Sequence, residues 1–366
     1  MVEKTHKRKD DHIDICLNQN IQAKQAKTGF EDISFVHKSL PEIDRQKIDL
    51  STNFLGHEFK APIIVGAMTG GTSEAEKINA SIAEVVEELG LGMGVGSQRV
   101  AIDDPKRAKT FSITRKNAPN AFLVANIGGV QLVHGYDLKE ARKAVEMIEA
   151  DALAIHLNAL QEVVQPEGQT NFEGVLAKIG EIAGELEVPV IVKETGSGIA
   201  AEEAKKLEAA GVKAIDVGGL GGTSFAGVEF HRIVEKKYEA NRQLGESFWD
   251  WGIPTAVSLA ETAQSVKIPI IASGGIRKGS DIAKALALNA SLASLAQPVL
   301  QTAGSVAETK RLLSILINEL QNVMFLVGAE KVRLLANSPL VISGKTSRWL
   351  RTRGFDVESY ARRGIK

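Results

Sequence analysis

Cysteine is almost absent from this chain of 366 residues, which contains only Cys16. A single cysteine cannot form an intramolecular disulfide, and such usage is typical of a reducing compartment. An excess of charge is also lacking, because 44 Lys and Arg residues are balanced by 45 Asp and Glu residues. The net charge of −1 provides no basic field that would attract nucleic acid or an anionic membrane. We therefore expect a cytoplasmic protein that binds neither nucleic acid nor membrane.

Long apolar runs are missing too. The most apolar tract, residues 285–300, is interrupted by Asn289, Ser291, Ser294 and Gln297, so we expect no transmembrane span. The first residues are charged, and no apolar signal-peptide core follows them. Hydrophobic residues make up 44% of the chain and charged residues 24%, which is typical of a soluble globular domain.

The chain does contain a repeated unit, in which a short apolar strand ends in polar or glycine-rich residues and is followed by an amphipathic helix. Eight strands are predicted, in residues 62–65, 91–95, 121–125, 152–157, 190–192, 214–217, 270–272 and 290–295. Helical spacing follows most of them, as in residues 74–89, 200–210 and 280–288. Continuous apolar strands that alternate with helices predict parallel pairing buried on both faces. Eight such units form an α/β fold, the (β/α)8 TIM barrel.

The chain is expected to be a single domain with three parts. Residues 1–60 form an N-terminal extension that contributes to the active-site mouth, and residues 61–300 form the barrel, with an insertion at about 223–267. Residues 301–366 form a C-terminal helical covering. An insertion after a barrel strand lies on the catalytic face, so this one is a candidate lid. The charged run around Arg8 and Lys9 is, by itself, typical of a solvated and partly disordered tail.

The fourth predicted strand changes abruptly from apolar to polar. Its end carries an imidazole, three amides and a carboxylate, from His156, Asn158, Gln161, Glu162 and Gln165. One such residue would be interpreted as a helix cap. Five together at the C-terminal end of a barrel strand indicate a binding or catalytic site, because that end of the barrel holds the site in this fold.

The seventh strand ends in Ser273-Gly274-Gly275-Ile276-Arg277. The two glycines allow a backbone to approach an anion closely, and the N–H groups at the start of the following helix point toward it. Arg277 can add a bidentate contact. This is also where barrels commonly hold a ligand phosphate, so the segment is predicted to be a phosphate cup.

Other strand ends suit a flat polar heterocycle. They offer backbone, hydroxyl, amide and ammonium groups at Ala67, Met68, Thr69, Ser97, Asn126, Lys193 and Gly218. The many neutral donors favour a flavin phosphate, although a lone Lys193 could instead form a Schiff base. Arg99 implies a second anion site if Arg8 and Lys9 fold over the mouth. Glu162, a hard oxygen ligand, could hold a Mg²⁺ ion that bridges this anion.

The ordered set of motifs resembles one family. The set comprises Met68-Thr69-Gly70-Gly71, Val95-Gly96-Ser97-Gln98-Arg99, His156-Leu157-Asn158 with Gln161-Glu162, Gln165-Pro166-Glu167-Gly168, Lys193-Glu194, Gly221-Gly222-Thr223 and Ser273-Gly274-Gly275-Ile276-Arg277. It closely resembles the type 2 isopentenyl-diphosphate isomerases, which are FMN-dependent (β/α)8 enzymes. The resemblance implies FMN, Mg²⁺, NADPH as the flavin reductant, and interconversion of isopentenyl and dimethylallyl diphosphates in isoprenoid biosynthesis. It also implies a homotetramer or homo-octamer.

The resemblance also implies a role for individual residues. Substrate would bind to Arg8, Lys9, His12, Ser97, Gln98, Arg99, His156, Asn158 and Gln161, and Mg²⁺ to Glu162. FMN would bind to Ala67, Met68, Thr69, Ser97, Asn126, Lys193, Gly218, Thr223, Gly274, Gly275, Arg277, Ala296 and Gln297. Proton transfer would involve Gln161, His156 and Glu229. Ala159 replaces a common proline and Phe225 a common tryptophan, but neither change removes a chemical group that the reaction needs.

Two other functions stay open. An FMN-dependent oxidoreductase of the same barrel class transfers a hydride, and it needs an acid or base beside the flavin and an Arg that binds a carboxylate. His156 and Arg99 could supply these groups. A flavin- or phosphate-binding barrel without catalytic activity is the other alternative.

Overall fold

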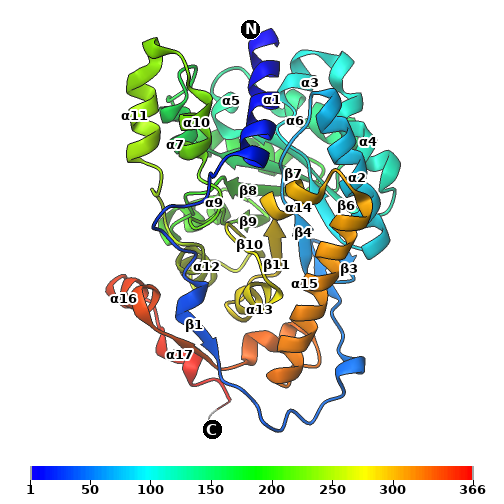
Figure 1. Cartoon of the computed structure of the whole chain (residues 1–366), viewed down its shortest axis with the longest axis vertical. Coiled ribbons are helices and arrows are strands. Elements are labelled where there is room, and N and C mark those ends of the chain that lie inside the picture. The colour runs from blue at the N-terminus through cyan, green and yellow to red at the C-terminus, as the bar shows by residue number, and fades with distance from the viewer. Residues whose placement is uncertain (1, 365–366) are drawn as a thin grey trace.

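Eight parallel strands form a closed barrel in the computed structural model, which describes residues 2–364, with side chains from Arg8 onward (Figure 1). The strands are β4 Ile63–Val65, β5 Gly92–Gly94, β6 Phe122–Gly128, β7 Ala152–Leu157, β8 Val190–Glu194, β9 Ala214–Asp216, β10 Ile270–Ser273 and β11 Leu292–Leu295. Each strand pairs with the next along the chain, and β11 pairs with β4 to close the barrel. All eight strands agree with the prediction, and the (β/α)8 fold is confirmed.

Helices surround the barrel. They are α1 Val2–Asn18, α2 Ser73–Leu89, α3 Arg99–Asp103, α4 Lys109–Asn117, α5 Gly129–Leu132, α6 Leu138–Ile148, α7 Ala159–Val164, α8 Val175–Glu185, α9 Ala201–Ala209, α10 Phe225–Arg232, α11 Glu239–Ser247, α12 Thr255–Ala263, α13 Gly279–Ala287, α14 Gln297–Thr302, α15 Val306–Leu326, α16 Gly344–Thr352 and α17 Glu358–Ala361. Short 3₁₀ helices are η1 Phe30–Asp32, η2 Arg45–Lys47, η3 Pro105–Arg107, η4 Lys236–Tyr238 and η5 Val332–Asn337.

Local sequence explains where these helices begin and end. Before α2, the Thr72 hydroxyl accepts a hydrogen bond from the Ala75 N–H, and after it Gly90 adopts the left-handed conformation that ends many helices. Asp137 and Glu140 form a capping box at the start of α6. None of the helices in the described part of the chain is both long enough and apolar enough to cross a membrane.

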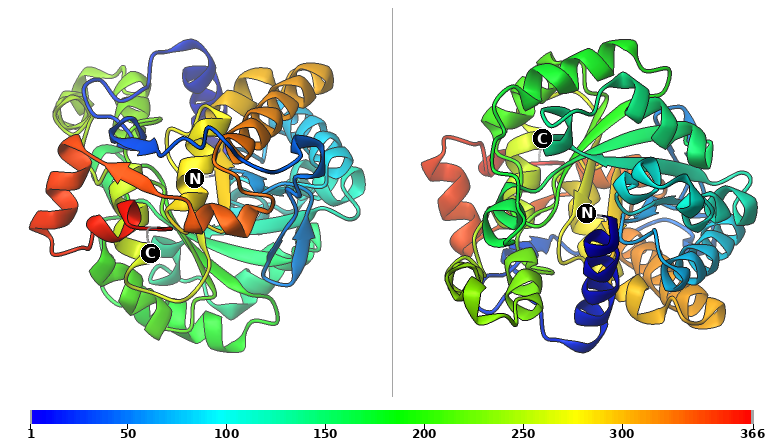
Figure 2. Two further views of the ribbon diagram at one scale, coloured as in Figure 1. Left: turned by 90° about the horizontal axis from the view of Figure 1, so that it is seen from below. Right: turned by 90° about the horizontal axis from the view of Figure 1, so that it is seen from above.

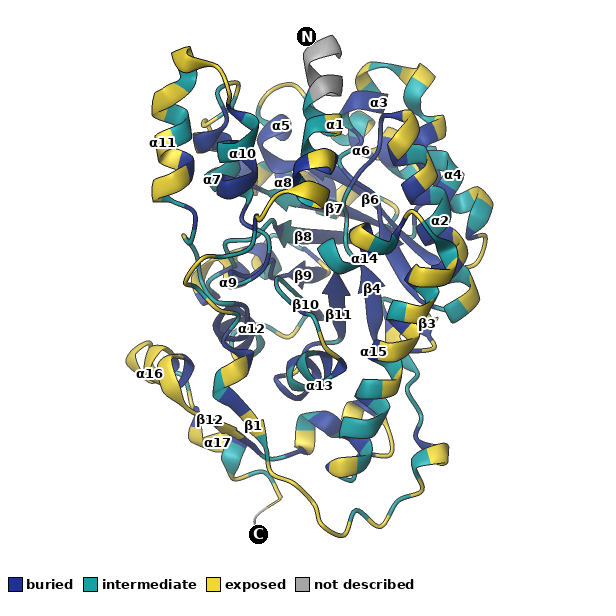
Figure 3. Ribbon diagram, in the orientation of Figure 1, coloured by how far each residue is buried: buried dark blue, intermediate teal, exposed yellow. Residues whose placement is uncertain are grey.

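The barrel strands are buried on both faces, as their apolar runs predict (Figure 3). Alternate residues of each strand face inward, because successive side chains point to opposite faces. The inward set forms a separate apolar cluster, to which the strands contribute Ile64, Phe122, Val124, Ala152, Ala154, Ile191, Ala214, Ile271 and Leu292. The interior at this level is therefore a packed core, and a site can open only beyond it.

A small hairpin seals the end of the barrel at which the strands begin. Strands β2 Thr52–Phe54 and β3 His57–Phe59 pair in antiparallel fashion. Phe54 and Phe59 are fully buried, and their ring centroids lie 5.8 and 5.6 Å from that of Phe122, the first residue of β6. These aromatic contacts leave only the opposite end of the barrel open to ligands.

The N-terminal segment was expected to be a solvated tail, but it forms helix α1. Ile13 and Ile15 are buried, and Ile15 packs with Val228 of α10. Apolar residues at these positions anchor the helix against the insertion, and α1 also packs near α3 (Figure 1). That Arg8 and Lys9 bind an anion together with Arg99 stays a prediction.

The C-terminal part was predicted to be helical, but it also contains a strand. Strand β12 Leu340–Ile342 pairs in antiparallel fashion with β1 Ile33–Phe35, so a segment of the N-terminal extension and a segment of the C-terminal part form a ribbon (Figure 2, left). Helices α16 and α17 lie beside this ribbon, at the end of the molecule opposite to the start of α1 (Figure 1). The prediction missed these strands because three residues are too few to show a periodic pattern.

The insertion after β9 contains α10, η4 and α11. Trp249 is buried against it, and its indole N–H donates a hydrogen bond to the Gln22 carbonyl at 2.9 Å. Asp250 accepts hydrogen bonds from the backbone N–H groups of Lys24 and Gln25. The insertion is therefore fastened to the N-terminal segment, whereas Trp251 is 61% exposed.

We expect Glu261 to anchor the C-terminal covering. Its fully buried carboxylate in α12 accepts hydrogen bonds from the Trp349 indole and the Arg353 guanidinium. In Glu261→Gln, an amide NH₂ would face these donors and leave one of them without an acceptor. The free energy of unfolding, measured in a thermal or urea melt, should therefore fall by on the order of 1–3 kcal/mol. Glu202→Gln is the matched control, because Glu202 binds the same Arg353 from an exposed position. Equal stability losses in the two variants would contradict this role.

Candidate active site

A layer of polar side chains lies directly beyond the apolar interior of the barrel. It consists of Asn126, His156, Lys193, Asp216, Ser273 and Ser294, each two residues after an inward-facing apolar residue of the same strand. Strand register places His156 beside Lys193, Lys193 beside Asp216, and Ser273 beside Ser294. Because the strands are parallel, these side chains converge at the open end of the barrel.

His156 is held as a neutral imidazole. Its Nδ1 lies 2.8 Å from the Asn126 Oδ1, and the Asn126 Nδ2 donates to the Val95 carbonyl at 3.0 Å. The Asn126 Oδ1 is therefore an acceptor, which places the proton on Nδ1 and leaves Nε2 as an acceptor. Burial, and then the nearby Lys193 charge, lower the pKa of His156 to about 3. His156 therefore stays neutral at neutral pH, and its Nε2 can accept a hydrogen bond but has no proton to donate.

Three cationic side chains at this end of the barrel bind neutral oxygens rather than carboxylates. Lys9 Nζ donates to the Gly70 and Ser97 carbonyls at 2.7 and 2.8 Å. Lys193 Nζ donates to the Glu194 carbonyl, and Arg277 donates to the side-chain oxygens of Gln22 and Gln297. None of the three forms an ion pair with a carboxylate within the described residues. Cations shielded from water in this way favour anionic ligands.

Burial, and then the positive charges of Arg8 and Arg107, lower the pKa of Lys9 to about 7. The site therefore contains one more positively charged residue, Arg107, than the predicted set of Arg8, Lys9 and Arg99. Arg107 was not predicted. It donates to the Gly71 carbonyl at 2.9 Å and pairs with Asp104.

The predicted phosphate cup is built from two glycine-rich loops in close contact. Gly274 and Gly275 have φ angles of 107° and 70°, which favour glycine. A Cβ on Gly275 would lie 2.5 Å from the Gly221 carbonyl oxygen, and one on Gly222 would lie 2.4 Å from the Gly275 nitrogen. Only glycine fits these positions, so the backbone can approach an anion closely beside the Arg277 guanidinium.

Asp216 is a member of the polar layer that the sequence analysis missed. Ser273 Oγ donates to its carboxylate and accepts a hydrogen bond from the Gly218 N–H at 3.0 Å. Burial raises the pKa of Asp216, while the Lys193 charge opposes the shift. Asp216 thereby fixes the ends of β9 and β10. The two-residue alternation of 214–217 could have identified it, because Ala214 and Asp216 share the inward face.

Glu229 of the insertion lies at the centre of a hydrogen-bond network. Its fully buried carboxylate is 2.9 Å from His12 Nε2, 3.2 Å from Gln161 Nε2 and 2.6 Å from Arg232 Nε. Burial acts to raise the pKa of Glu229, but the His12 hydrogen bond and charge and the Arg232 charge outweigh it and lower the pKa to about 2. An ionised Glu229 therefore connects α1, α7 and α10 beside Gln161.

Arg232 extends this network outward. Its guanidinium also contacts Glu167 at 2.9 Å, and Glu167 lies 3.7 Å from Arg8. The structure thus brings together the predicted residues Arg8, His12, Gln161 and Glu229.

Glu162 is buried in α7, and its carboxylate accepts hydrogen bonds from Asn158 Nδ2, Gln165 Nε2 and the Gln169 N–H. No Lys, Arg or His forms an ion pair with it among residues 8–364. In the described part of the chain, no three or more His, Cys, Asp or Glu residues form a cluster that could bind a metal ion by itself. A single carboxylate with amide neighbours fits Mg²⁺, which is commonly bound by one or two carboxylates together with substrate phosphates.

The remaining predicted residues lie near the same end of the barrel. Ala67, Met68 and Thr69 follow β4, Ser97 follows β5, Gly218 and Thr223 follow β9, and Ala296 and Gln297 follow β11. Arg99 begins α3, and its Nε lies 3.9 Å from Asp103. Gln98 is fully buried, and its amide bonds to the Asn126 N–H and the Ala144 carbonyl. Ligand contact by each of these residues stays a prediction.

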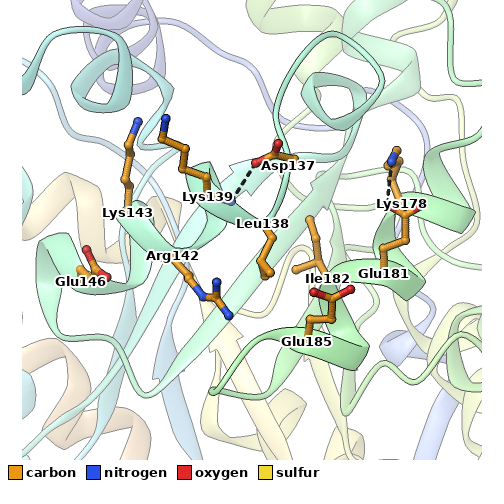
Figure 4. Close-up of a pocket in the computed structure, with 10 residues that line it drawn as sticks. All are labelled: Asp137, Leu138, Lys139, Arg142, Lys143, Glu146, Lys178, Glu181, Ile182 and Glu185. Atoms are coloured by element: carbon orange, nitrogen blue, oxygen red, sulfur yellow. Dashed lines mark hydrogen bonds and ion pairs between the residues drawn. The ribbon is translucent and has the colours of Figure 1, made fainter.

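A surface groove of about 630 Å³ lies away from this site (Figure 4). Its walls are α6 and α8, on the outside of the barrel. Basic residues such as Arg142 and Lys178 alternate there with acidic residues such as Glu146 and Glu181. The balance of charges gives the groove no preference for an anion, so we place the active site at the barrel mouth.

Comparison with known proteins identifies the class. The sequence profile of the FMN-dependent dehydrogenase family matches residues 2–118 and 130–342. A solved mandelate oxidase variant with an FMN adduct superposes with a TM-score of 0.65 at 18% identity, covering 93% of this chain and 100% of the oxidase, which shows a shared fold. The chain belongs to the FMN-dependent dehydrogenase family.

Full-length relatives narrow the class further. The isopentenyl-diphosphate delta-isomerase of Methanosarcina mazei is 47% identical, over 98% of this chain and 98% of the relative. That of Thermococcus kodakarensis is 49% identical, over 98% of this chain and 97% of the relative. Within the flavin class, the chain therefore belongs to the isopentenyl-diphosphate delta-isomerase family, as its motifs predicted.

We expect Gly275→Ala to lose FMN. Its methyl group would clash with Gly221 and Thr28 and move the backbone of the phosphate cup. Gly135→Ala is the control, because Gly135 also has a positive φ, 106°, but no atom lies within 4 Å of the added Cβ. That control should show only backbone strain, about 1–3 kcal/mol. The flavin content of each variant after dialysis is the measurement, and equal FMN retention would count against the cup.

Proposed function

We propose that the protein interconverts isopentenyl and dimethylallyl diphosphates with reduced FMN and Mg²⁺. The observation that carries the proposal is the set of cations Lys9, Lys193 and Arg277, which lie at one barrel mouth and bind only neutral oxygens. An FMN phosphate and a substrate diphosphate are two separate anions that such a mouth can bind. Membership in the isomerase family supports the same reading.

The residues around the mouth fit FMN. The tight glycine loops and the Arg277 guanidinium suit its phosphate, and Lys193 supplies a cation near the polar layer. When bound in reduced form, FMN supplies an electron-rich ring system that can exchange protons, with NADPH as the proposed reductant. The residues of the mouth would hold this ring next to the apolar layer of the barrel interior, which excludes water.

Arg8, Lys9 and Arg99 would clamp the diphosphate on the side of α1. Lys9 now donates to two backbone carbonyls, and a diphosphate oxygen would be a stronger, charged acceptor. The clamp fixes the alkene at one position, and such positioning can account for about 7–11 kcal/mol of a barrier when the geometry is right. Glu162 would hold Mg²⁺ against the same diphosphate.

Moving a double bond requires one proton to be added and another to be removed, without net oxidation. Gln161 lies between Asn158 and Glu229, to both of which it is hydrogen-bonded, so its amide has a fixed orientation. Glu229 stays ionised and His156 stays neutral at neutral pH, because their pKa values are lowered to about 2 and about 3. We propose that Gln161 and His156 orient the alkene or relay a proton, and that Glu229 contributes a carboxylate beside Gln161.

A hydride-transferring oxidoreductase is the second candidate, and the FMN-dependent dehydrogenase profile favours it. The two functions differ in reductant use. We expect the reduced holoenzyme to convert isopentenyl diphosphate into dimethylallyl diphosphate while NADPH loss stops once the flavin is reduced. Product is measured by chromatography and NADPH by its absorbance. NADPH consumption in proportion to turnover would support the oxidoreductase, and bound flavin with neither activity would support a binding protein.

We also propose a cytoplasmic homotetramer or homo-octamer. The single cysteine supports the reducing location. Exposed apolar side chains such as Leu244, Trp251 and Trp349 are consistent with subunit contacts.

Lys9 gives the substrate site a pH dependence. Because its pKa is about 7 in the structure, Lys9 is mostly neutral at pH 8. An arriving diphosphate stabilises the ammonium and raises the pKa, so binding should take up close to one proton at pH 8 and much less at pH 6. Calorimetry of inorganic pyrophosphate binding to the holoenzyme, in buffers of different ionisation enthalpy, measures the uptake.

Lys9→Arg is the matched control, since arginine stays charged throughout this range. It should bind pyrophosphate without the extra uptake at pH 8. The assignment to Lys9 is wrong if wild type and Lys9→Arg take up the same number of protons.

A further inference from the structure

The carboxylate of Glu162 is held by amides alone. Asn158 Nδ2 donates to its Oε1 at 3.0 Å, and Gln165 Nε2 donates to its Oε2 at 2.5 Å. The Gln169 N–H donates to Oε2 at 2.8 Å. A buried carboxylate usually has a cationic partner, because a charged group that loses its contact with water is unfavourable unless an opposite charge compensates it. The described part of the chain offers Glu162 no such partner.

The same two amides each have an oxygen without a partner. Only four buried side-chain polar atoms among the described residues lack a hydrogen bond, and two of them are Asn158 Oδ1 and Gln165 Oε1. Both residues are 4% exposed. A buried amide oxygen without a hydrogen bond is unfavourable, so two of them around one carboxylate indicate a missing donor at that place.

Helix α7 brings these groups together. Asn158 directly precedes α7 and Gln165 directly follows it, and the side chains of both are hydrogen-bonded to Glu162 within the helix. Each amide uses its nitrogen to hold the carboxylate, so its oxygen lies on the same planar group, close to Glu162. The result is a cluster of oxygens that suits a hydrated divalent cation, whose bound waters are strong donors.

We propose that Gln165 is a positioning residue of the divalent-cation site. Its Nε2 fixes the Glu162 carboxylate, and its Oε1 accepts a hydrogen bond from a water molecule on the cation. Asn158 Oδ1 has an equivalent place on the other side of Glu162. This inference rests on the proposed role of Glu162 as the Mg²⁺ ligand, and it adds the residue that orients the ligand and completes the shell.

Mn²⁺ binding tests the proposal. The holoenzyme is titrated with Mn²⁺ in the presence of inorganic pyrophosphate, and free Mn²⁺ is measured by electron paramagnetic resonance. Gln165→Met keeps the side-chain volume but removes both polar groups, so Mn²⁺ affinity should fall about 10- to 100-fold. Gln264→Met is the matched control, because Gln264 also bonds through both amide groups, to Tyr360 and Asp356, in the C-terminal covering. Its Mn²⁺ affinity should equal that of wild type.

A second variant separates a cation contact from a purely structural role. Gln165→Glu places two carboxylates side by side, which lowers thermal stability in the absence of metal. If residue 165 faces the cation, Mn²⁺ with pyrophosphate should raise the melting temperature of Gln165→Glu more than that of wild type. If residue 165 only supports the helix, the shift should be the same in both proteins.

Unchanged Mn²⁺ affinity in Gln165→Met, or equal metal-dependent shifts for Gln165→Glu and wild type, overturns the role of Gln165. Glu162→Gln is measured in parallel, and it should bind Mn²⁺ more weakly than any Gln165 variant. If Glu162→Gln binds Mn²⁺ as well as wild type does, the metal site itself has been misplaced.

Discussion

Partly buried positive charge at the open end of the barrel is the constraint on which the site depends. The interior below is a packed apolar layer, so the polar layer above it is poorly hydrated. Lys9, Lys193 and Arg277 are held there by carbonyl and amide oxygens, which satisfy their donors without neutralising their charge. The pKa values of Lys9 and His156 are low for the same reason, because burial disfavours the charged, protonated form of each side chain. Anions relieve this unfavourable charge when they bind.

The barrel and its extension divide the task of building this site. Strand register fixes the polar layer, since a shift of one residue would turn Lys193 and His156 outward. Helix α1 and the insertion then close one side of the mouth through Glu229, which bonds to both His12 and Arg232. The other side of the mouth is formed by two glycine-rich loops, which contact each other at Gly222 and Gly275. The site is thus assembled from elements that are distant in sequence, and different contacts hold each of them in place.

Much of this arrangement could be predicted from sequence. The eight strands were recognisable because buried parallel strands are apolar on both faces, and the strand ends were recognisable because polar residues follow them abruptly. Helix α1 was not predicted because its buried anchors, Ile13 and Ile15, are two residues apart, which is not a helical spacing, and they follow a charged run. The β1–β12 ribbon was missed because pairing between distant short segments leaves no local signal. The hydrogen bonds of Gln98, His156 and Gln165 could not be predicted, because their partners come close only in the folded chain.

We propose that this charged mouth holds a diphosphate for proton exchange and not for hydride transfer. The most direct measurement is turnover of isopentenyl diphosphate by the reduced holoenzyme in deuterium oxide, with mass spectrometric analysis of the product. The account predicts dimethylallyl diphosphate that carries deuterium from the solvent, formed in many turnovers for each flavin reduced. A product that contains no solvent deuterium, or one whose formation consumes one reductant per molecule, would contradict it.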